Sequence, residues 1–290
     1  LLQETIEWLK PKAGGTYVDC TVNRAGHSKE IAKIIGSKGT LIIFDLDSQA
    51  LSEAKETLES LPDAPKVIAV NANFRTLAGV LATHHIDTID GLIADLGLSS
   101  QELDSAGRGF TFRFDEPLLM TFADTVDDST VTAKDIVNDW KEESIADIIY
   151  GFADERYARR IAKRILEARE VKPIETTFQL VDIIASAVPA NYRHGKTHFA
   201  TKTFQALRMA TNDELGSIKE LISTLPNVLA FGARACIITF HSTEDRTVKN
   251  LIRDTEGLTL VSKKAIVPQD GESKSNPRAR SAQLRIAERI

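Results

Sequence analysis

Acidic side chains stand directly after three short apolar runs in the first part of the chain. Asp19 ends the first run, Asp45 and Asp47 follow the second, and Asp95 follows a later one. In an open parallel sheet the carboxyl ends of the strands share one edge, and nucleotide-like ligands bind there. A carboxylate at that edge can accept hydrogen bonds from ribose hydroxyls or from an amine. The spacing therefore predicts a nucleoside site built from these strand ends.

The stretch Thr16–Ser28 (TYVDCTVNRAGHS) reads as a strand, a turn and the start of a helix. The free N–H groups of a helix N-terminus and a closely approaching loop suit a nucleotide-like ligand. The turn contains Asn-Arg-Ala-Gly in place of G-x-G-x-x-G, which disfavours hydride transfer from NAD. We expect Asp47 to cap the next helix, which leaves Asp45 for the ribose hydroxyls.

Asp95 opens the sequence Asp-Leu-Gly-Leu-Ser-Ser at the end of the predicted fourth strand. Gly97 lets a ligand come close, and the Asp95 carboxylate can accept a hydrogen bond from an amine. Ser99 and Glu102 suit a capping box for a following helical turn. This pattern assigns chemistry to Asp95 and a structural role to the serine.

A similar group follows the predicted fifth strand, in the sequence Thr-Phe-His-Ser-Thr-Glu-Asp-Arg that starts at Thr239. Ser242 and Asp245 suit a capping box, which is a structural role. His241 stands at the carboxyl edge of the strand. A substrate contact and a satisfied core histidine are equally good interpretations of it.

Segment 108–115 is a glycine-containing loop that carries aromatic rings and guanidinium groups. Phe110 and Phe112 suit stacking on an unpaired base, and Arg108 and Arg113 suit its phosphates. This combination predicts contact with single-stranded RNA.

The predicted helix 154–170 gathers positive charge on one face of an otherwise acidic chain. Its cations are Arg156, Arg159, Arg160, Lys163 and Arg164, opposite Tyr157, Ile161 and Ile165. Further cations follow at Arg193, Lys196, Lys202, Arg208, Arg278 and Arg280. A run of charge is usually a solvated face, but this concentration favours RNA as a partner.

The bulk composition excludes several classes of protein. The 290 residues are 42% hydrophobic with a formal net charge of −5, which disfavours non-specific binding to nucleic acid. Two cysteines give neither a disulfide framework nor a metal-binding spacing, so we expect no metal and a reducing, cytoplasmic location. No apolar run has membrane-spanning length and no signal peptide is seen, so we expect no membrane association.

Apolar periodicity predicts strands that alternate with helices. The strands are expected near 16–20, 40–44, 67–70 and 88–94, and the helices near 27–35, 49–61 and 75–82. From 104 to 200 only turns and helices are expected, and the alternation then resumes with strands near 235–240, 258–262 and 282–287. We therefore predict an α/β, doubly wound domain over 1–103 and 201–290, split by a helical insertion over 104–200.

The ordered motifs of the chain resemble those of the bacterial 16S ribosomal RNA methyltransferase H family, also called RsmH or MraW. They are DCTVNRAGHS, FDLDSQA, DLGLSSQELD, RGFTFRFDEPL, DERYARRIA, HFATKTFQALRMATNDEL, TFHSTEDRTVK and NPRARSAQLRIAER. The resemblance implies a Rossmann-like class I S-adenosylmethionine-dependent methyltransferase sheet with an inserted all-helical domain. It implies methylation of the exocyclic N4 of a cytidine in the decoding region of 16S ribosomal RNA, within the small ribosomal subunit. It also implies that a short N-terminal segment precedes residue 1.

The resemblance also implies roles for individual residues. The expected contacts to S-adenosyl-L-methionine are Ala25, Gly26, His27, Asp45, Phe74, Asp95 and Glu102. Asp95, His241 and Asp245 are expected to act on the cytosine. The expected RNA contacts are Arg108, Phe110, Phe112, Arg113, Arg156, Arg160, Lys163, Arg278 and Arg280.

The chain departs from the family pattern at several positions. Cys20, Asn23 and Ala25 stand where the family usually has glycines, and Glu102 replaces a glutamine. Leu119 and Thr121 stand in a segment that usually carries an aspartate and an arginine. Asn readily adopts a positive φ, whereas Ala meets a steric cost there.

Three alternative functions remain open from the sequence. A relative with impaired cofactor binding could act as a ribosome-assembly or RNA-binding factor. An NAD-dependent oxidoreductase is disfavoured by the missing glycine fingerprint, and methylation of DNA or of another RNA would use the same strand ends.

Overall fold

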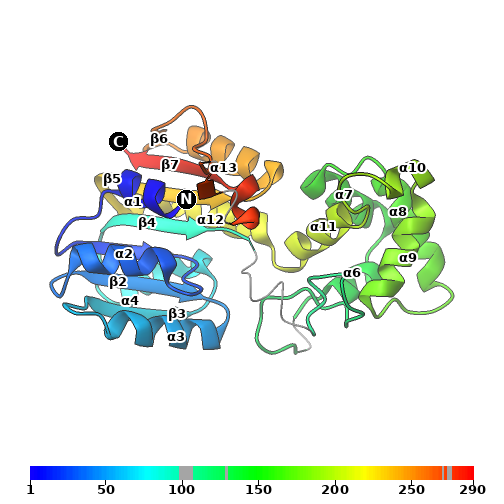
Figure 1. Cartoon of the computed structure of the whole chain (residues 1–290), viewed down its shortest axis with the longest axis horizontal. Coiled ribbons are helices and arrows are strands. Elements are labelled where there is room, and N and C mark those ends of the chain that lie inside the picture. The colour runs from blue at the N-terminus through cyan, green and yellow to red at the C-terminus, as the bar shows by residue number, and fades with distance from the viewer. Residues whose placement is uncertain (98–106, 128–129, 270, 273–275) are drawn as a thin grey trace. The chain divides into compact units, whose positions relative to one another are not determined.

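The computed structural model describes residues 1–97, 107–127, 130–269, 271–272 and 276–290 (Figure 1). The chain divides into two compact units. Leu1–Gly97 together with Leu215–Ile290 form the sheet unit, and Leu98–Glu214 form the helical unit. The expected contact Glu102 and the serines after Gly97 lie outside the described residues.

The described residues of the sheet unit contain one seven-stranded sheet in the order β3-β2-β1-β4-β5-β7-β6. The strands are β1 (Thr16–Asp19), β2 (Thr40–Asp45), β3 (Lys66–Asn71), β4 (Ile89–Asp95), β5 (Leu229–Thr239), β6 (Leu258–Leu260) and β7 (Gln283–Arg289). β1 to β5 are parallel, whereas β7 runs antiparallel to β5 and β6. This is the Rossmann-like methyltransferase sheet that was predicted. The strand order reverses between β1 and β4, which marks the carboxyl edge there as a ligand crevice.

Helices cover both faces of the sheet. On one face lie α1 (Leu2–Leu9), α2 (Gly26–Ile35) and α3 (Ser48–Glu59), and on the other lie α4 (Leu77–Thr83), α12 (Glu214–Val228) and α13 (Ser242–Asp254). The short helices η1 (Phe74–Thr76) and η2 (Pro277–Ser281) belong to the same unit. Tyr17 packs into one layer and Val18 into the other, as the alternation of side chains along a strand requires. Strands that are buried on both faces explain the continuous apolar runs of the sequence.

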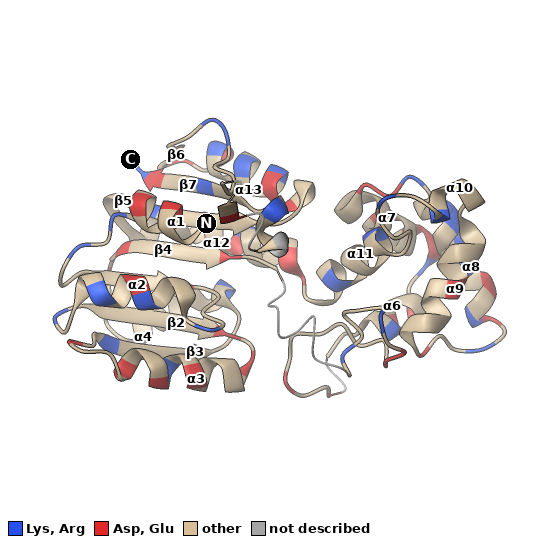
Figure 2. Ribbon diagram, viewed as in Figure 1, with Lys and Arg blue, Asp and Glu red and all other residues tan. Residues whose placement is uncertain are grey.

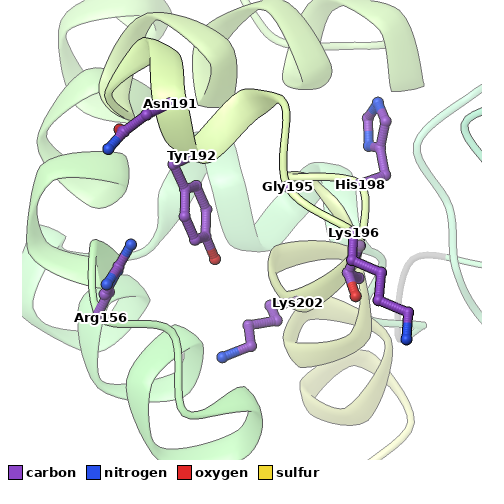
Figure 3. A pocket seen from close by; sticks show the side chains of 8 residues that line it. Arg156, Asn191, Tyr192, Gly195, Lys196, His198 and Lys202 are labelled. Carbon is purple, nitrogen blue, oxygen red and sulfur yellow. The ribbon is translucent and has the colours of Figure 1, made fainter.

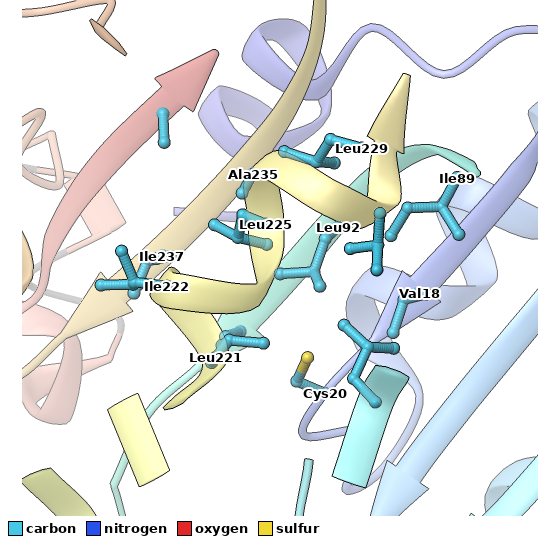
Figure 4. Close-up of a cluster of buried hydrophobic side chains, with 14 of the residues drawn as sticks. Val18, Cys20, Ile89, Leu92, Leu221, Ile222, Leu225, Leu229, Ala235 and Ile237 are labelled. Atoms are coloured by element: carbon cyan, nitrogen blue, oxygen red, sulfur yellow. The ribbon is translucent and has the colours of Figure 1, made fainter. Parts of the chain in front are cut away.

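The core below α12 shows how this packing arises. Figure 4 shows Leu221, Ile222 and Leu225 of α12 lying over side chains of β1, β4 and β5. Leu92 and Ile237 are two of these strand residues, and neither exposes measurable surface. The i, i+1, i+4 spacing of the three helix residues puts them on one face of the helix.

The helical unit contains α6 (Ala133–Asp139), α7 (Glu142–Ala153), α8 (Ala158–Arg169), α9 (Thr177–Ala187), α10 (Ala190–Arg193) and α11 (Thr201–Thr211). Two capping boxes start its helices, from Thr132 to Asp135 and from Thr176 to Gln179. Each box satisfies backbone N–H groups that a helix start leaves unpaired. The apolar faces of these helices share one buried core.

The compact units differ from the expected domain limits at 104 and 200. α11 was expected to belong to the sheet domain, but it packs against α6 and α7. Phe204 and Leu207 of α11 are buried in the core of the helical unit. Helical periodicity reveals that α11 has an apolar face, but it does not reveal which unit covers that face.

β5 starts at Leu229, six residues before the expected strand 235–240. Phe231 is 78% exposed and Gly232 has a φ of 73°, so the first part of the strand lacks the apolar pattern of a buried one. Both cysteines are buried and free. Across the described residues, no helix is long and apolar enough to cross a membrane.

Candidate active site

The carboxylate that ends β1 holds the loop that follows it. Asp19 Oδ2 accepts a hydrogen bond from the hydroxyl of Ser28 at 2.7 Å, and Oδ1 accepts one from the N–H of Thr21 at 3.1 Å. The side chain is only 2% exposed. Burial raises the pKa of Asp19 to about 6. Asp19 therefore joins the end of β1 to the first turn of α2.

The loop before α2 adopts a left-handed backbone at two positions where the family usually has glycine. Asn23 has a φ of 45° and Ala25 a φ of 57°. Ala25 is buried at the N-cap of α2, and its N–H donates to the Val22 carbonyl at 2.7 Å. A Cβ atom at Gly26 would meet no neighbour within 4 Å. The loop thus keeps a glycine-type backbone, with free space beside Gly26.

The end of β2 is tied to the same loop. Asp45 Oδ2 accepts from the N–H of Asn23 at 2.8 Å, and Oδ1 accepts from the N–H of Asp47 at 3.0 Å. Burial raises the pKa of Asp45. Asp47 Oδ1 accepts from the N–H of Ala50 at 3.0 Å, which confirms the predicted cap of α3. Phe74 follows β3 in η1 and is partly buried against the sheet core.

Asp95 and His27 form the centre of the crevice between β1 and β4. His27 Nδ1 lies 4.0 Å from Asp95 Oδ2. Asp95 Oδ1 and His27 Nε2 are buried, and neither has a hydrogen-bond partner among the described residues. Buried polar atoms rarely stay unpaired, so these two atoms indicate a place for a ligand.

Burial sets the protonation of this pair. Burial, together with the neighbouring charges of Asp19 and Glu244, raises the pKa of Asp95 to about 7. Burial lowers the pKa of His27 to about 4, so its imidazole is neutral near pH 7. About a third of the Asp95 side chain is exposed (35%), which leaves it accessible from the crevice. A left-handed φ of 100° at Gly97 then turns the chain away from β4.

The end of β5 contributes His241 and Glu244. His241 is the N-cap of α13, and its Nδ1 accepts from the N–H of Glu244 at 3.3 Å. The fully buried Glu244 has Oε1 at 2.9 Å from His241 Nε2, and Oε2 accepts from the N–H of Phe240 at 3.1 Å. These contacts hold His241 at the carboxyl edge of the sheet.

One expectation for the start of α13 is wrong. Ser242 and Asp245 form no capping box, because His241 takes the N-cap position. Asp245 instead receives two hydrogen bonds from Arg285 of β7, at 2.7 and 2.8 Å. Both side chains are largely buried, with 14% and 7% exposed. The Asp245 carboxylate therefore joins α13 to β7, and its catalytic role stays a prediction.

The aromatic loop of the helical unit also differs from expectation. Phe110 is buried, 5.5 Å from the ring of Phe122, so it offers no free face to a base. Phe112 lies between His198 and Phe204, at 4.4 and 5.1 Å. Both rings pack against the core of the helical unit.

Phe114 is the ring of this loop that sequence analysis missed. Its side chain is 58% exposed, yet its carbonyl accepts from the Thr177 hydroxyl at 2.8 Å. Asp115 accepts from the N–H of Phe178, and the buried Glu116 accepts from the N–H of Gly109. The loop is thus held to α9 while it exposes one aromatic ring.

The predicted RNA cations lie in different settings. Figure 2 shows Lys and Arg positions along α8 and α10. Arg156 and Arg160 lie over the Tyr157 ring at 4.9 and 5.6 Å, whereas Lys163 lies 4.0 Å from Glu167. Arg108 lies 3.6 Å from Asp124. Arg113 and Arg280 are exposed, and the side chain of Arg278 is outside the described part.

Asp19 and Glu244 also lie in the site. Asp19 was predicted there as a carboxylate that ends an apolar strand, like Asp45 and Asp95, although no individual role was assigned to it. No signal in the sequence pointed to Glu244, since a glutamate in the first turn of a helix is ordinary. No group of three or more potential metal ligands is assembled in the described chain.

The strand order defines a Rossmann-like α/β protein, a fold in which nucleotide-like ligands bind at the carboxyl ends of the strands. The sequence signature of the MraW methylase family matches residues 1–290. The chain therefore belongs to the MraW methylase family, whose methyl donor is S-adenosyl-L-methionine.

Two relatives illustrate the similarity. A protein of Synechocystis sp. is 45% identical over 288 residues, which cover 98% of this chain and 90% of that protein. One of Acetivibrio thermocellus is 44% identical over 309 residues, which cover 100% of this chain and 97% of that protein. Both are named "Ribosomal RNA small subunit methyltransferase H".

Solved structures are more distant by sequence. A putative rRNA-methylase from Clostridium thermocellum is 13% identical, covers 100% of this chain and 97% of its own, and has a TM-score of 0.45. A methyltransferase homolog from Pyrococcus horikoshii is 13% identical and has a TM-score of 0.48. The match covers 100% of this chain and 66% of that chain. The fold assignment stands on the strand order and not on these two structures.

Proposed function

We propose that this chain transfers a methyl group from S-adenosylmethionine to the exocyclic N4 of a cytidine in the decoding region of 16S ribosomal RNA. The observation that carries the proposal is the family match over residues 1–290. The relatives at 44–45% identity bear a name that specifies ribosomal RNA of the small subunit. The small ribosomal subunit is accordingly the proposed partner.

The crevice residues fit this methyl donor. Asp45 retains acceptor capacity for ribose hydroxyls, and Phe74 follows the adjacent strand with an apolar face for the adenine. The space beside Gly26 leaves room for the methionine part of the donor. His27 Nε2 and Asp95 Oδ1, which have no hydrogen-bond partner among the described residues, leave hydrogen-bonding capacity for it. The bound donor would supply an electrophilic sulfonium methyl group.

The proposed role of the protein is to position the amine and to receive its hydrogen bonds. The cytosine amine is a poor nucleophile because its lone pair is delocalised into the ring. Asp95 is the proposed acceptor for an N4–H bond as positive charge develops on nitrogen. His241 is the proposed contact that holds the cytosine, with Glu244 fixing its ring.

The helical unit is the proposed RNA contact surface. A base must be unpaired or flipped out before its N4 can be reached. We infer that Phe114, rather than the buried Phe110, supplies the aromatic face, with Arg113 beside it for a phosphate.

A transfer assay tests the proposal directly. Small subunits from a strain that lacks this modification are incubated with protein and methyl-labelled S-adenosylmethionine, with naked 16S RNA and DNA in parallel. The expected result is label on N4 of one cytidine in the subunit. Label on DNA, on another RNA or on another atom would contradict the proposal.

Calorimetry distinguishes the enzyme from the alternative of a ribosome-assembly factor. Calorimetry with S-adenosylmethionine should show binding, because the left-handed backbone at Asn23 and Ala25 preserves the loop. RNA binding with no detectable cofactor binding would indicate the non-enzymatic alternative.

A further inference from the structure

The described residues of the helical unit form a pocket of about 420 Å³. Eight residues line it, namely Arg156, Asn191, Tyr192, Gly195, Lys196, Thr197, His198 and Lys202. Three of them are cations and none is acidic. They come from the segment before α8, from α10, from the segment that follows α10, and from α11.

The walls of this pocket are held by packing. The Tyr192 hydroxyl donates to the buried Glu155 carboxylate, and its ring meets that of Tyr157 edge-on at 5.0 Å. His198 stacks between Phe112 and Phe199, at 4.4 and 4.3 Å. Burial lowers the pKa of His198, which keeps this wall neutral near pH 7. The pocket is therefore preorganised rather than formed by loose side chains.

The three cations lack the counter-ions that other cations of the unit have. Arg164 pairs with Glu167 at 2.6 Å, and Arg208 pairs with Glu214 at 2.7 Å. No carboxylate of the described chain forms an ion pair with Arg156, Lys196 or Lys202.

The cations are nevertheless positioned. The Arg156 guanidinium lies over the Tyr157 and Tyr192 rings at 4.9 and 5.0 Å. Lys202 Nζ donates to the Asp154 carbonyl at 2.8 Å, which leaves two of its three donors. Figure 3 shows Arg156, Tyr192 and Lys202 pointing toward a common space, whereas the side chain of Lys196, on the neighbouring loop, points away from it.

We propose that this pocket binds a phosphodiester group of the RNA substrate, with Arg156, Lys196 and Lys202 as its ligands. The inference rests on the proposed function for the identity of the RNA. Guanidinium and ammonium groups are the usual partners of phosphate, and the lining of this pocket contains three cations and no carboxylate. The site anchors RNA on residues of the helical unit.

Salt-dependent binding of a short labelled single-stranded RNA tests this site in the full-length protein. In Lys196→Gln and in Arg156→Gln the affinity should fall about fivefold at 0.1 M salt, and the slope of log affinity against log salt should fall by about 0.7. Lys134→Gln is the matched control, because Lys134 of the same unit already pairs with Glu175 at 3.3 Å. Its salt slope should equal that of the wild type.

Three results would overturn the proposal. The first is a salt slope that is unchanged in both pocket variants. The second is a loss of RNA affinity in Lys134→Gln equal to that in the pocket variants. The third is binding of inorganic phosphate to the pocket while the pocket variants keep the wild-type affinity for RNA. A melting temperature equal to that of the wild type identifies folded variants, and Arg156→Lys should restore part of the affinity. The measurement needs no methyl transfer, so an inactive wild-type protein would refute the proposed function without affecting this test.

Discussion

At the scale of single residues, Asp95 carries the proposed chemistry. Its Oδ1 is buried and has no hydrogen-bond partner among the residues that the structure describes, and burial raises its pKa to about 7. We expect Asp95→Asn to lower kcat by a factor of about 10² to 10³, the usual loss when one preorganised polar contact is removed. Labelled methyl transfer measures the loss, and circular dichroism should show an unchanged fold. Wild-type activity in this variant would refute the assignment.

The same residue predicts a pH dependence. The ionised Asp95 carboxylate accepts hydrogen bonds at both oxygens and stabilises positive charge on the amine, and the raised pKa moves this ionisation up to about pH 7. The value of kcat/KM for the donor should therefore rise as the pH increases from 6 to 8 and then level off. The residual activity of Asp95→Asn should lack this step.

The raised pKa of Asp19 predicts that this residue stabilises the fold less as the pH rises. Its pKa rises from 3.8 to about 6 on folding, so the folded state binds the proton more tightly. Its contribution to stability is full below pH 3.8 and is lost as the pH rises to 6, by at most about 3 kcal/mol. Urea unfolding of wild type and Asp19→Asn at pH 4.5 and 7 should show the variant gaining relative stability at the higher pH. A pH-independent difference would contradict this.

At the scale of elements, the ion pair between α13 and β7 predicts a large structural effect. Asp245→Asn leaves the nearly buried Arg285 without its counter-ion and should lower the free energy of unfolding by about 3 to 5 kcal/mol. Asp254→Asn on the same helix is the control. Asp254 pairs with Arg253 in full exposure, so thermal unfolding should show no measurable change. Equal effects in the two variants would contradict the assignment.

Segment 108–115 contains one aromatic residue that we expect to affect RNA binding and another that we expect to affect stability. Phe114→Ala should weaken RNA binding by about 1 to 3 kcal/mol, the value of one stacked base, without changing stability. Phe110→Ala should instead lower the free energy of unfolding by about 3 to 5 kcal/mol, because its ring is buried. Fluorescence anisotropy and thermal melts measure the two quantities. A Phe114 variant with wild-type RNA affinity would remove this residue from the RNA surface.

Sequence periodicity predicted most elements because strands buried on both faces and amphipathic helices leave distinct patterns. It predicted the cap at Asp47 and the carboxylates at the strand ends. It missed the role of Phe114 because the loop's exposure depends on hydrogen bonds to Thr177, more than sixty residues away in sequence. The pairing of Asp245 with Arg285 was missed for the same reason, because the two residues are far apart in sequence.

At the scale of the whole molecule, the alternating pattern and the helical insertion predicted the fold class. The helical unit extends to Glu214 because α11 buries its apolar face there. Local sequence does not encode such a choice between two cores. The crevice could be predicted because one rule places all parallel strand ends at one edge.

A crystal structure with S-adenosylmethionine bound tests whether the strand ends of the sheet unit hold the methyl donor. We predict the ribose at Asp45, the adenine beside Phe74 and the methyl-bearing sulfur near Asp95 and His27. A donor bound elsewhere, or crystals in which this crevice stays empty at saturating cofactor, would contradict this prediction.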